Sequence, residues 1–576
     1  MATGGEEASP ASERGKRRGA DAELLLAAAV LGCVLVVGLL TVGNYSVTVD
    51  EFNADEYGRK SLAWYSSGFT DRSSFETVED TLWYYGPWFH ILIAWIQSLG
   101  LADHWTVRHA TTFVTGLAGI ALLLPIGRLA LGRWAGLTAV TLCLTCGCLY
   151  GSLFFTPIDV PFLLAMSLAM LAMLAMVARP VPAWPATMGA GLATGLAIAT
   201  RSSGVITQVY LLAAMGLCCL EVLAGPRAAA RGDLLQIGAR LGAALAIGWV
   251  TAILLWPWLQ IGNPISQFVA GFLLFANHPN SFDMPFWGTR VVTTDLPWFY
   301  VPGQFLARLP EGFLLLLATG IASGFLAAWR FARASAPALM QHRATELQDV
   351  ALSLARSRGY LLVWAAVVLP LSFIIVRHST LYDSIRHVMF IIPMLALIAG
   401  AGFLRLLPVV CRFPATAAAL GGGYLGFAIW LLAVLHPLEY IATNVVVGGV
   451  AGAYGRFDLD YWAVAALVAL RRLESRLGYE HPDLFSKSPP SIMVCMSYRE
   501  WGVEPLFGRP WRNETDPHNA DFIIATERWH CADGVDDAVL IDKVERFGRP
   551  FAWVYSRTPL GQLGSPVTSW LHQWDR

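Results

Sequence analysis

Residues 24–40 read LLLAAAVLGCVLVVGLL, an uninterrupted apolar run. With its flanks the run reaches about 20 residues, the length that a helix needs to cross the hydrocarbon core of a bilayer. A basic stretch, Arg14–Arg18, precedes it, and no small-residue cleavage site lies between it and Asp50. We therefore expect a retained membrane anchor rather than a cleaved signal peptide.

Apolar runs of this kind recur as far as Leu435. We expect about eleven spans, near residues 23–43, 108–127, 134–152, 159–178, 184–200, 203–222, 238–257, 304–329, 359–376, 387–404 and 414–435. The stretch 87–99 is apolar but short, which favours a re-entrant or interfacial helix. The sequence thus predicts a polytopic α-helical membrane protein.

The composition agrees with this fold class. Of the 576 residues, 56% are hydrophobic and 14% are charged, and the net charge of −1 gives no reason to expect nucleic acid as a partner. Cys143, Cys146 and Cys148 fall inside an apolar run, where cysteine usually packs as a small hydrophobic residue rather than binding metal. Cys495 and Cys531 could form a disulfide if the C-terminal part lies outside the cytoplasm.

Along the predicted spans, arginine-rich short loops alternate with loops that hold few arginines. Placing the N-terminus in the cytoplasm leaves the arginine-rich short loops on the cytoplasmic side throughout, as the positive-inside rule requires. We expect a disordered cytoplasmic tail (1–22), a transmembrane catalytic domain (23–435) with a first outer loop (44–107), and an extracytoplasmic α/β domain (436–576). Its strand-like runs are 491–497, 520–526 and 550–556. An integral protein of a bacterial inner (plasma) membrane fits this pattern.

Acidic residues stand at the outer ends of two spans. Asp50 and Glu51 follow the first span, and Asp159 lies between prolines in Pro157-Ile-Asp-Val-Pro161. A carboxylate that faces a cavity can take a proton from a bound hydroxyl. Solvated loop acids at 50–51 and a helix N-cap at Asp159 are the structural alternatives. A helix in the first loop would put Glu51 and Asp55 on one face and turn Asp50 elsewhere.

Basic residues also gather on the outer side, against the positive-inside bias. They are Arg201 and, within one short loop, Arg377, His378, Arg386 and His387, with Asp383 among them. Arginine suits phosphate because its forked donors match the phosphate oxygens. Snorkelling to the membrane interface is the alternative for each single arginine. Two Arg-His pairs in one outer loop favour contact with a phosphate or pyrophosphate.

The loop 277–303 ends in Asp295-Leu-Pro-Trp-Phe-Tyr-Val-Pro302. Its aromatic residues either line a groove for lipid or sugar or lie at the depth of the lipid headgroups. The sequence leaves both interpretations open.

These motifs, in this order and on one side, resemble the GT-C glycosyltransferases. The closer resemblance is to the bacterial branch of the protein mannosyltransferase family (glycosyltransferase family 39), which includes the aminoarabinose transferases of lipid A. It covers roughly residues 45–465. The segments 296–302, 385–393, 436–440 and 458–462 also carry it. No tandem β-trefoil insertion of the eukaryotic members is evident, so a Ser/Thr protein acceptor is not implied.

The resemblance implies a polyprenyl-phosphate-linked sugar donor and transfer to a lipid, glycan or protein acceptor outside the membrane, with inversion. Asp50 would be the general base, and Glu51 would support it or bind the acceptor. Arg386 and His387, with Arg201 as a further candidate, would hold the leaving phosphate, and Asp159 would orient substrate or a basic partner. No cofactor is firmly implied; such a displacement does not require a metal ion, and a divalent metal is left open.

Three other functions fit part of the pattern. A flippase or transporter for lipid-linked glycans would use the same cationic cavity, but it would need polar residues at mid-membrane depth. An envelope glycan polymerase or ligase would differ in the size of donor and acceptor. An envelope assembly scaffold would work through the C-terminal domain.

Overall fold

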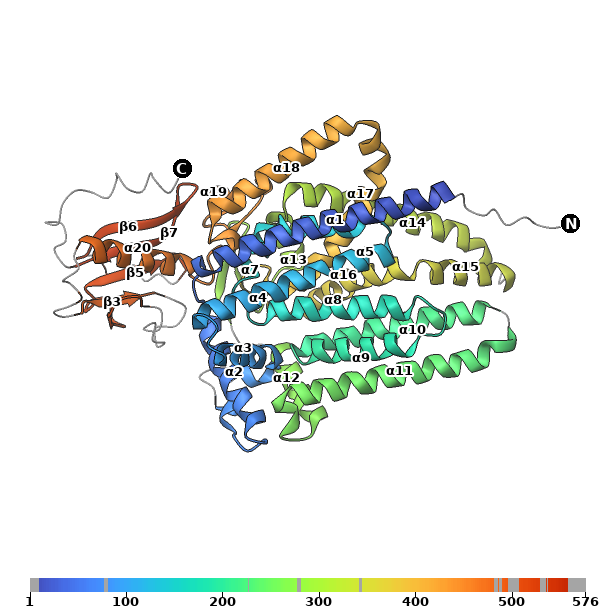
Figure 1. Cartoon of the computed structure of the whole chain (residues 1–576), viewed down its shortest axis with the longest axis horizontal. Helices are drawn as coiled ribbons and strands as arrows, with labels where there is room; N and C mark the ends of the chain where they lie inside the picture. Colours follow the sequence, from blue (N-terminus) through green and yellow to red (C-terminus); the bar gives the residue numbers. More distant parts are fainter. Residues whose placement is uncertain are drawn as a thin grey trace.

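The computed structural model describes residues 10–76, 81–225, 227–276, 281–340, 344–480, 485, 489–495, 507–528, 535 and 537–557. A bundle of long helices carries a small α/β domain at one end (Figure 1). Within the described residues, nine helices are long and apolar enough to cross a membrane. The predicted fold class, a polytopic helical membrane protein with a small C-terminal α/β domain, is confirmed.

The spanning helices follow the predicted apolar runs. They comprise α1 (Pro10–Thr41), α4 (His104–Ala121) continued by α5 (Leu123–Ala130), α8 (Asp159–Met176), α10 (Ile206–Ala224), α11 (Arg227–Leu255), α14 (Glu311–Met340), α16 (Arg358–Arg377), α17 (Ile392–Arg412) and α18 (Pro414–Leu435).

Two of the eleven predicted spans are helical but too short for a span of ordinary length. Residues 134–152 divide into α6 (Ala135–Leu144) and α7 (Gly147–Ser152), and residues 184–200 hold α9 (Trp184–Ile198). A Cβ on Gly147 would lie 2.7 Å from the Cβ of Ala442. The break between α6 and α7 therefore lets a later part of the chain pack against the glycine.

The N-terminal tail differs from the expectation for residues 1–22. Helix α1 begins at Pro10, so residues 10–22 are helical. Proline suits a first helical turn, and the following Ala, Glu, Arg and Lys are good helix formers, which explains why the helix extends beyond the apolar run.

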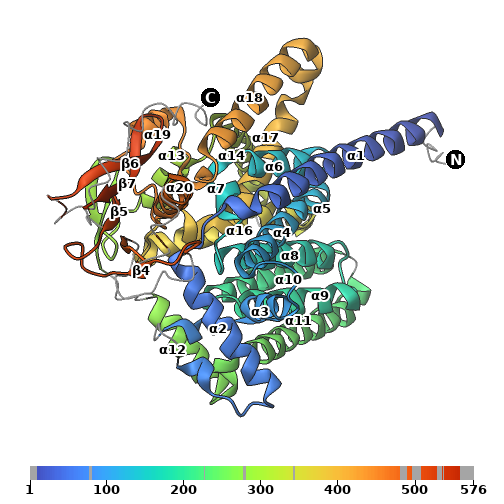
Figure 2. The ribbon, with the colours of Figure 1, turned by 60° about the vertical axis from the view of Figure 1, so that its left-hand side comes forward.

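The first outer loop (44–107) is mostly helical. It contains α2 (Val49–Ser66) and α3 (Trp88–Ser98), which pack together beside the end of the bundle (Figure 2). The stretch predicted as a short helix at 87–99 is α3. Thr48 and Glu51 form a capping box that fixes where α2 begins.

The segment between α11 and α14 contributes further elements at the end of the bundle where α2 and α3 lie. It holds α12 (Pro264–Ala276), a hairpin of β1 (Asp283–Phe286) and β2 (Thr289–Val292), and α13 (Tyr300–Arg308). Arg308 is buried and donates to the carbonyl oxygens of Tyr440, Ala442 and Asp458, at 3.4, 3.4 and 2.6 Å. It thereby fixes the start of the C-terminal part against α13.

The α/β domain is a five-stranded sheet in the order β4-β3-β5-β7-β6, with α20 (Val464–Glu480) packed on β5, β6 and β7. The strands are β3 (Ser491–Val494), β4 (Arg512–Asn513), β5 (Phe522–Thr526), β6 (Val539–Arg546) and β7 (Arg549–Ser556). Strand β3 runs parallel to β4 and β5, and β7 runs antiparallel to its neighbours. Three strands lie where the sequence predicts them, whereas β4 and β6 were not predicted.

Two arginines fasten this domain to the bundle. Arg471 donates to the carbonyl oxygens of Gly43 and Asn44, both at 3.0 Å, just beyond α1. Arg546 donates to the carbonyl oxygen of His436, at 2.8 Å, just beyond α18. These contacts satisfy carbonyl groups that helix ends leave unpaired. Cys495 is disulfide-bonded, and Cys531, its predicted partner, lies outside the described residues.

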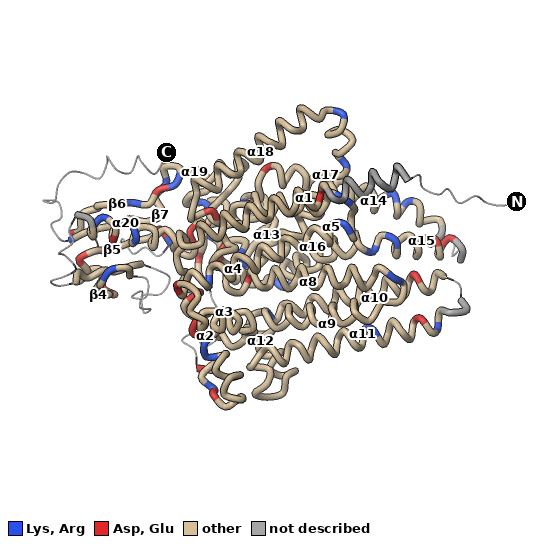
Figure 3. The backbone as a smooth tube through the Cα atoms, viewed as in Figure 1, with Lys and Arg blue, Asp and Glu red and all other residues tan. Residues whose placement is uncertain are grey.

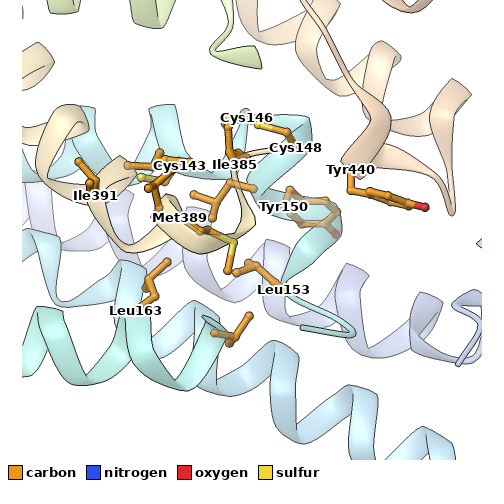
Figure 4. Packing of buried hydrophobic residues seen from close by; sticks show 14 of the residues in the cluster. Cys143, Cys146, Cys148, Tyr150, Leu153, Leu163, Ile385, Met389, Ile391 and Tyr440 are labelled. Carbon is orange, nitrogen blue, oxygen red and sulfur yellow. Dashed lines mark hydrogen bonds between the residues drawn. The ribbon is translucent and has the colours of Figure 1, made fainter. Parts of the chain in front are cut away.

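One hydrophobic core contains buried residues of both the bundle and the α/β domain. Figure 4 shows the part of it around Cys143, Leu153 and Met389. Cys143, Cys146 and Cys148 are buried in it, as the interpretation of these cysteines as hydrophobic residues predicts. Ile385 and Met389 are buried in the same cluster, so they fix the chain on both sides of Arg386.

Charged residues concentrate toward the ends of the helices (Figure 3). Lysine and arginine are common at the end far from the α/β domain, which is the end that the positive-inside rule assigns to the cytoplasm. The orientation itself stays a prediction.

Candidate active site

Arg386 lies at the centre of a group of acidic side chains where the bundle meets the α/β domain. Its Nη1 atom lies 2.8 Å from Oδ2 of Asp50 and 2.8 Å from Oδ2 of Asp383. Its Nε atom lies 3.7 Å from Oδ2 of Asp159. The fold therefore brings together four residues that the sequence singles out, although most of them lie far apart in the chain.

A strained turn places Arg386 and Asp383 side by side. Asp383 and Ser384 have φ angles of +55° and +61°, in the left-handed region that residues other than glycine rarely adopt. The Ser384 hydroxyl donates to Oε1 of Gln304 on α13, at 3.2 Å. Such backbone strain persists where the surroundings impose it and is common at functional sites.

Asp159 connects two arginines. It is the first residue of α8, whose N-cap position is held by Ile158. Asp159 pairs instead with Nη1 of Arg201 and, as stated above, faces Arg386. The structure therefore does not support the interpretation of Asp159 as a helix N-cap.

Asp50 lies in the first turn of α2 and faces the same cluster. Its side chain is 34% exposed, against 8% or less for Asp159, Asp383 and Asp458. Asp50 is therefore not a freely solvated loop acid, and of these four carboxylates it is the most exposed.

Glu51 points to another part of the molecule. It is buried, accepts a hydrogen bond from the backbone N–H of Thr48 at 2.9 Å, and lies 3.1 Å from Nε2 of His109 and 3.8 Å from Nε of Arg108. Asp55, on the same face of α2, lies 3.5 Å from Nη1 of Arg108. As helix periodicity predicts, Glu51 and Asp55 share a face, and together they anchor α2 on α4.

The α/β domain contributes an arginine that the sequence analysis missed. Nη2 of Arg528 lies 2.7 Å from Oδ1 of Asp383 and 3.6 Å from Oδ2 of Asp458, and Nη1 donates to the carbonyl oxygen of Tyr461 at 2.7 Å. Burial opposes the charge of Arg528, but Asp383 and Asp458 outweigh this effect and raise its pKa. The position of Arg528 just beyond the carboxyl end of a strand was the available signal, because ligand sites of α/β sheets lie there.

Aromatic rings enclose the central guanidinium. Tyr382 and Trp462 present their rings to Arg386, with centroids 5.5 and 5.7 Å from its Cζ atom. Cations over aromatic faces are attracted to the ring electrons. Trp462 comes from the segment 458–462, which carries the sequence resemblance.

Two acids beside the cluster have strongly raised pKa values. Burial raises the pKa of Asp460 to about 7, although its oxygens accept hydrogen bonds from the Tyr440 hydroxyl and from backbone N–H groups. Burial, and then repulsion by Asp458, raises the pKa of Glu527 to about 7. Both side chains therefore change protonation near neutral pH.

An apolar groove runs up to the cluster. A cavity of about 260 Å³ is lined by apolar residues of α10, α12 and α16, among them Val209, Phe272 and Phe373. Arg201 and His387 also line it, as does Tyr382. The ring of His387 lies 4.5 Å from that of Tyr382, edge to face. The groove thus joins an apolar channel to basic side chains that contact the Arg386 cluster.

Arg377 and His378 lie outside the cluster. They end α16, and both side chains are exposed. No group of three or more His, Cys, Asp and Glu side chains arranged to hold a metal ion occurs among the described residues.

Comparison with known proteins gives matches to structures alone. No family model matches the chain, and no curated protein matches its sequence. Apo ArnT from Cupriavidus metallidurans matches with 14% identity and a TM-score of 0.47, over 95% of this chain and 100% of that one. ArnT bound to undecaprenyl phosphate matches with 15% identity and a TM-score of 0.44, over 94% and 99%.

The apo oligosaccharyltransferase of Archaeoglobus fulgidus matches with 12% identity and a TM-score of 0.40, over 86% of this chain and 69% of that one. These likenesses concern the path of the backbone alone and are not evidence of a shared substrate. By its own helices, the chain belongs to the polytopic α-helical membrane proteins.

Proposed function

We propose that the protein is a membrane glycosyltransferase that moves a sugar from a polyprenyl-phosphate donor to a lipid, glycan or protein acceptor of the cell envelope, with inversion. The observation that carries this proposal is the bridge made by Asp159. It joins Arg201, which lines the apolar groove, to Arg386, which holds Asp50. A site for an anionic lipid is thereby connected to a candidate base.

The groove suits the donor because it combines two chemistries. Its apolar walls match a polyprenyl chain, which stays in the bilayer, and Arg201 and His387 match a phosphate. Both ends of such a lipid would be bound without taking its chain into water.

The charges of the cluster suggest how the base becomes active. Asp50, Asp159, Asp383 and Asp458 face three guanidinium groups, those of Arg201, Arg386 and Arg528. A donor phosphate that binds Arg386 competes with the carboxylates there, and Asp50 is the most exposed of them. When the phosphate displaces Asp50 from Arg386, Asp50 becomes an unpaired base beside the bound donor.

The reaction then follows in one displacement. The acceptor hydroxyl oxygen attacks the anomeric carbon while the bond from that carbon to the phosphate oxygen breaks. The bonding electrons leave with the phosphate, which the arginines stabilise, and Asp50 takes the hydroxyl proton. Attack from the face opposite the phosphate inverts the anomeric centre.

Transport of a lipid-linked glycan fits the site less well. Alternating access places a substrate site near the middle of the membrane. The cluster instead joins helix ends, the first outer loop and the α/β domain. A catalytic role at one face agrees better with this position.

Mass spectrometry of envelope glycolipids and glycoproteins, with and without the chain, tests the proposal. We expect at least one species to lose the mass of one sugar unit when the chain is absent. Unchanged glycans, with lipid-linked sugar accumulating on one side of the membrane, would support transport instead.

A further inference from the structure

A second cavity lies on the segment between α12 and α13, and we call it the hairpin pocket. It has a volume of about 420 Å³, and its lining includes Phe286, Trp287, Thr289, Asp295 and Phe299. None of its lining residues lines the apolar groove. The pocket is therefore a separate site.

The lining of the pocket suits a sugar ring. A sugar has a face of C–H groups that packs on an aromatic ring, and hydroxyl groups that donate to a carboxylate. The pocket offers the half-buried Trp287 and the exposed Phe299 for the first contact, with the buried Phe286 as its floor, and Asp295 with Thr289 for the second. Asp295 is exposed and forms no ion pair with any described residue.

The backbone conformation at Trp287 indicates that the tryptophan side chain has a role besides forming the turn. Trp287 and Gly288 join β1 to β2 with φ angles of +53° and +83°. Tight hairpin turns with two positive φ angles favour Asn, Asp or Gly at the first position. A tryptophan there is strained, and such outliers point toward function.

The hairpin packs against the C-terminal part and against α13. The backbone N–H of Gly288 donates to the carbonyl oxygen of Arg456 at 3.1 Å. On α13, a Cβ at Gly303 would lie 2.8 Å from the ring of Phe286 and 2.9 Å from Nε1 of Trp287. The absence of a side chain at Gly303 therefore allows the hairpin to pack closely against α13.

The same segment reaches the catalytic cluster. The ring of Phe282, just before β1, lies 5.8 Å from the ring of Tyr382. The Cζ atom of Arg528 lies 5.6 Å from the centroid of the Phe282 ring. Tyr382 in turn lines the donor groove and faces Arg386. The segment that carries the hairpin pocket thus also contacts residues of the cluster.

We propose that the hairpin pocket is a carbohydrate subsite for the acceptor, which holds one sugar unit of a glycan or glycolipid. This proposal rests on the proposed function and narrows it, because an acceptor that carries sugar is favoured over an unglycosylated protein. The donor has its own groove with basic residues, so the pocket is assigned to the other substrate.

Saturation-transfer NMR on the full chain in phospholipid nanodiscs tests the subsite. The probes are the methyl glycosides of glucose, galactose and N-acetylglucosamine, with glycerol as a polyol control. We expect at least one glycoside to give a signal well above that of glycerol. Trp287→Asn suits the turn but removes the aromatic ring, and Asp295→Asn removes the charge; each should reduce the signal to the glycerol level.

Trp298→Asn is the matched control, because Trp298 is 67% exposed and does not line the pocket. This variant should bind the glycoside as the unaltered protein does. No glycoside signal in the unaltered protein, or an unchanged signal in Trp287→Asn, would overturn the proposal. Equal losses in Trp287→Asn and Trp298→Asn would overturn it in favour of an aromatic patch at headgroup depth.

Binding of undecaprenyl phosphate, measured on the same samples, separates the two proposals. We expect Trp287→Asn to bind it as the unaltered protein does. Binding of undecaprenyl phosphate without any glycoside signal would refute the subsite and leave the transferase proposal standing. A glycoside signal that depends on Trp287, without binding of undecaprenyl phosphate, would refute the donor and support a carbohydrate site.

Discussion

Nη1 of Arg386 lies 2.8 Å from Oδ2 of Asp50, so the most exposed carboxylate of the cluster is paired with its central cation. This pairing occupies the Asp50 carboxylate until another anion takes the arginine. The expected anion is the donor phosphate. Donor binding and activation of the base are then coupled through one side chain.

The first prediction concerns Arg201, which connects the groove to the cluster. Arg201→Ala should weaken binding of undecaprenyl phosphate, because a lost charged hydrogen bond in a buried site costs about 2–5 kcal/mol. Arg377→Ala is the matched control, since Arg377 is exposed at the end of α16. Native mass spectrometry can compare both variants. Equal affinities for Arg201→Ala and the unaltered protein would remove Arg201 from the donor site.

The second prediction concerns the contact between Arg528 and Asp383. Arg528→Gln and Asp383→Asn should each lower kcat/KM, because each removes the 2.7 Å ion pair that joins the α/β domain to the cluster and leaves the remaining buried charges less well balanced. The double variant should be less impaired than the sum of the single effects, with a coupling of about 0.5–3 kcal/mol. Strictly additive losses would show that the α/β domain does not act through this pair.

The sequence predicted the helices better than the site. Runs such as 24–40 must be helical in a bilayer, because no water is present to bind the backbone groups. Asp50, Asp159 and Arg386 could be singled out because a charged residue at the end of an apolar run calls for a structural or functional explanation. Arg528 and Asp458 were harder to single out, since charged residues are ordinary in a polar domain, and only the position of Arg528 just beyond a predicted strand marked it.

Glu51 shows that the contacts of two neighbouring residues could be told apart only in the structure. The sequence presents Asp50 and Glu51 as one acidic pair, but the capping box with Thr48 turns Glu51 toward Arg108 and leaves Asp50 facing Arg386. Which arginine each acid meets depends on how α2 packs on α4. Local sequence does not contain that information.

The third prediction is a pH dependence of stability. The pKa values of Asp460 and Glu527 are raised to about 7 in the folded protein, from ordinary values of 3.8 and 4.5. A raised acid pKa stabilises the fold fully below the ordinary value, and this stabilisation is lost as the pH rises to about 7. The Tm should therefore be lower at about pH 8 than at about pH 5. Asp460→Asn should make this difference smaller, and an unchanged difference would contradict the role of Asp460.

The fourth prediction concerns topology. Reporter fusions after residue 340, beyond α14, should report the cytoplasm, and fusions after residue 480, beyond α20, should report the opposite side. The reason is the loop-by-loop asymmetry of arginine. Reporters on the same side would mean that the Arg386 cluster does not face the side assigned to it.

Asp50 is proposed to activate the acceptor, and Asp50→Asn isolates this role. The variant keeps shape and polarity but removes the base, and loss of a general base typically lowers the rate by about 10²–10⁴-fold. Glu51→Gln is the companion variant: it should lower the Tm, because Glu51 is buried with Arg108 and His109.

The deciding measurement is mass spectrometry of the envelope from cells that carry Asp50→Asn at the unaltered protein level. We predict that the sugar modification disappears as it does without the chain, while the protein keeps its Tm and still binds undecaprenyl phosphate. A modification at the unaltered level in Asp50→Asn cells would contradict Asp50 as the base. If Glu51→Gln, correctly folded, abolished it instead, the base would be the neighbouring acid.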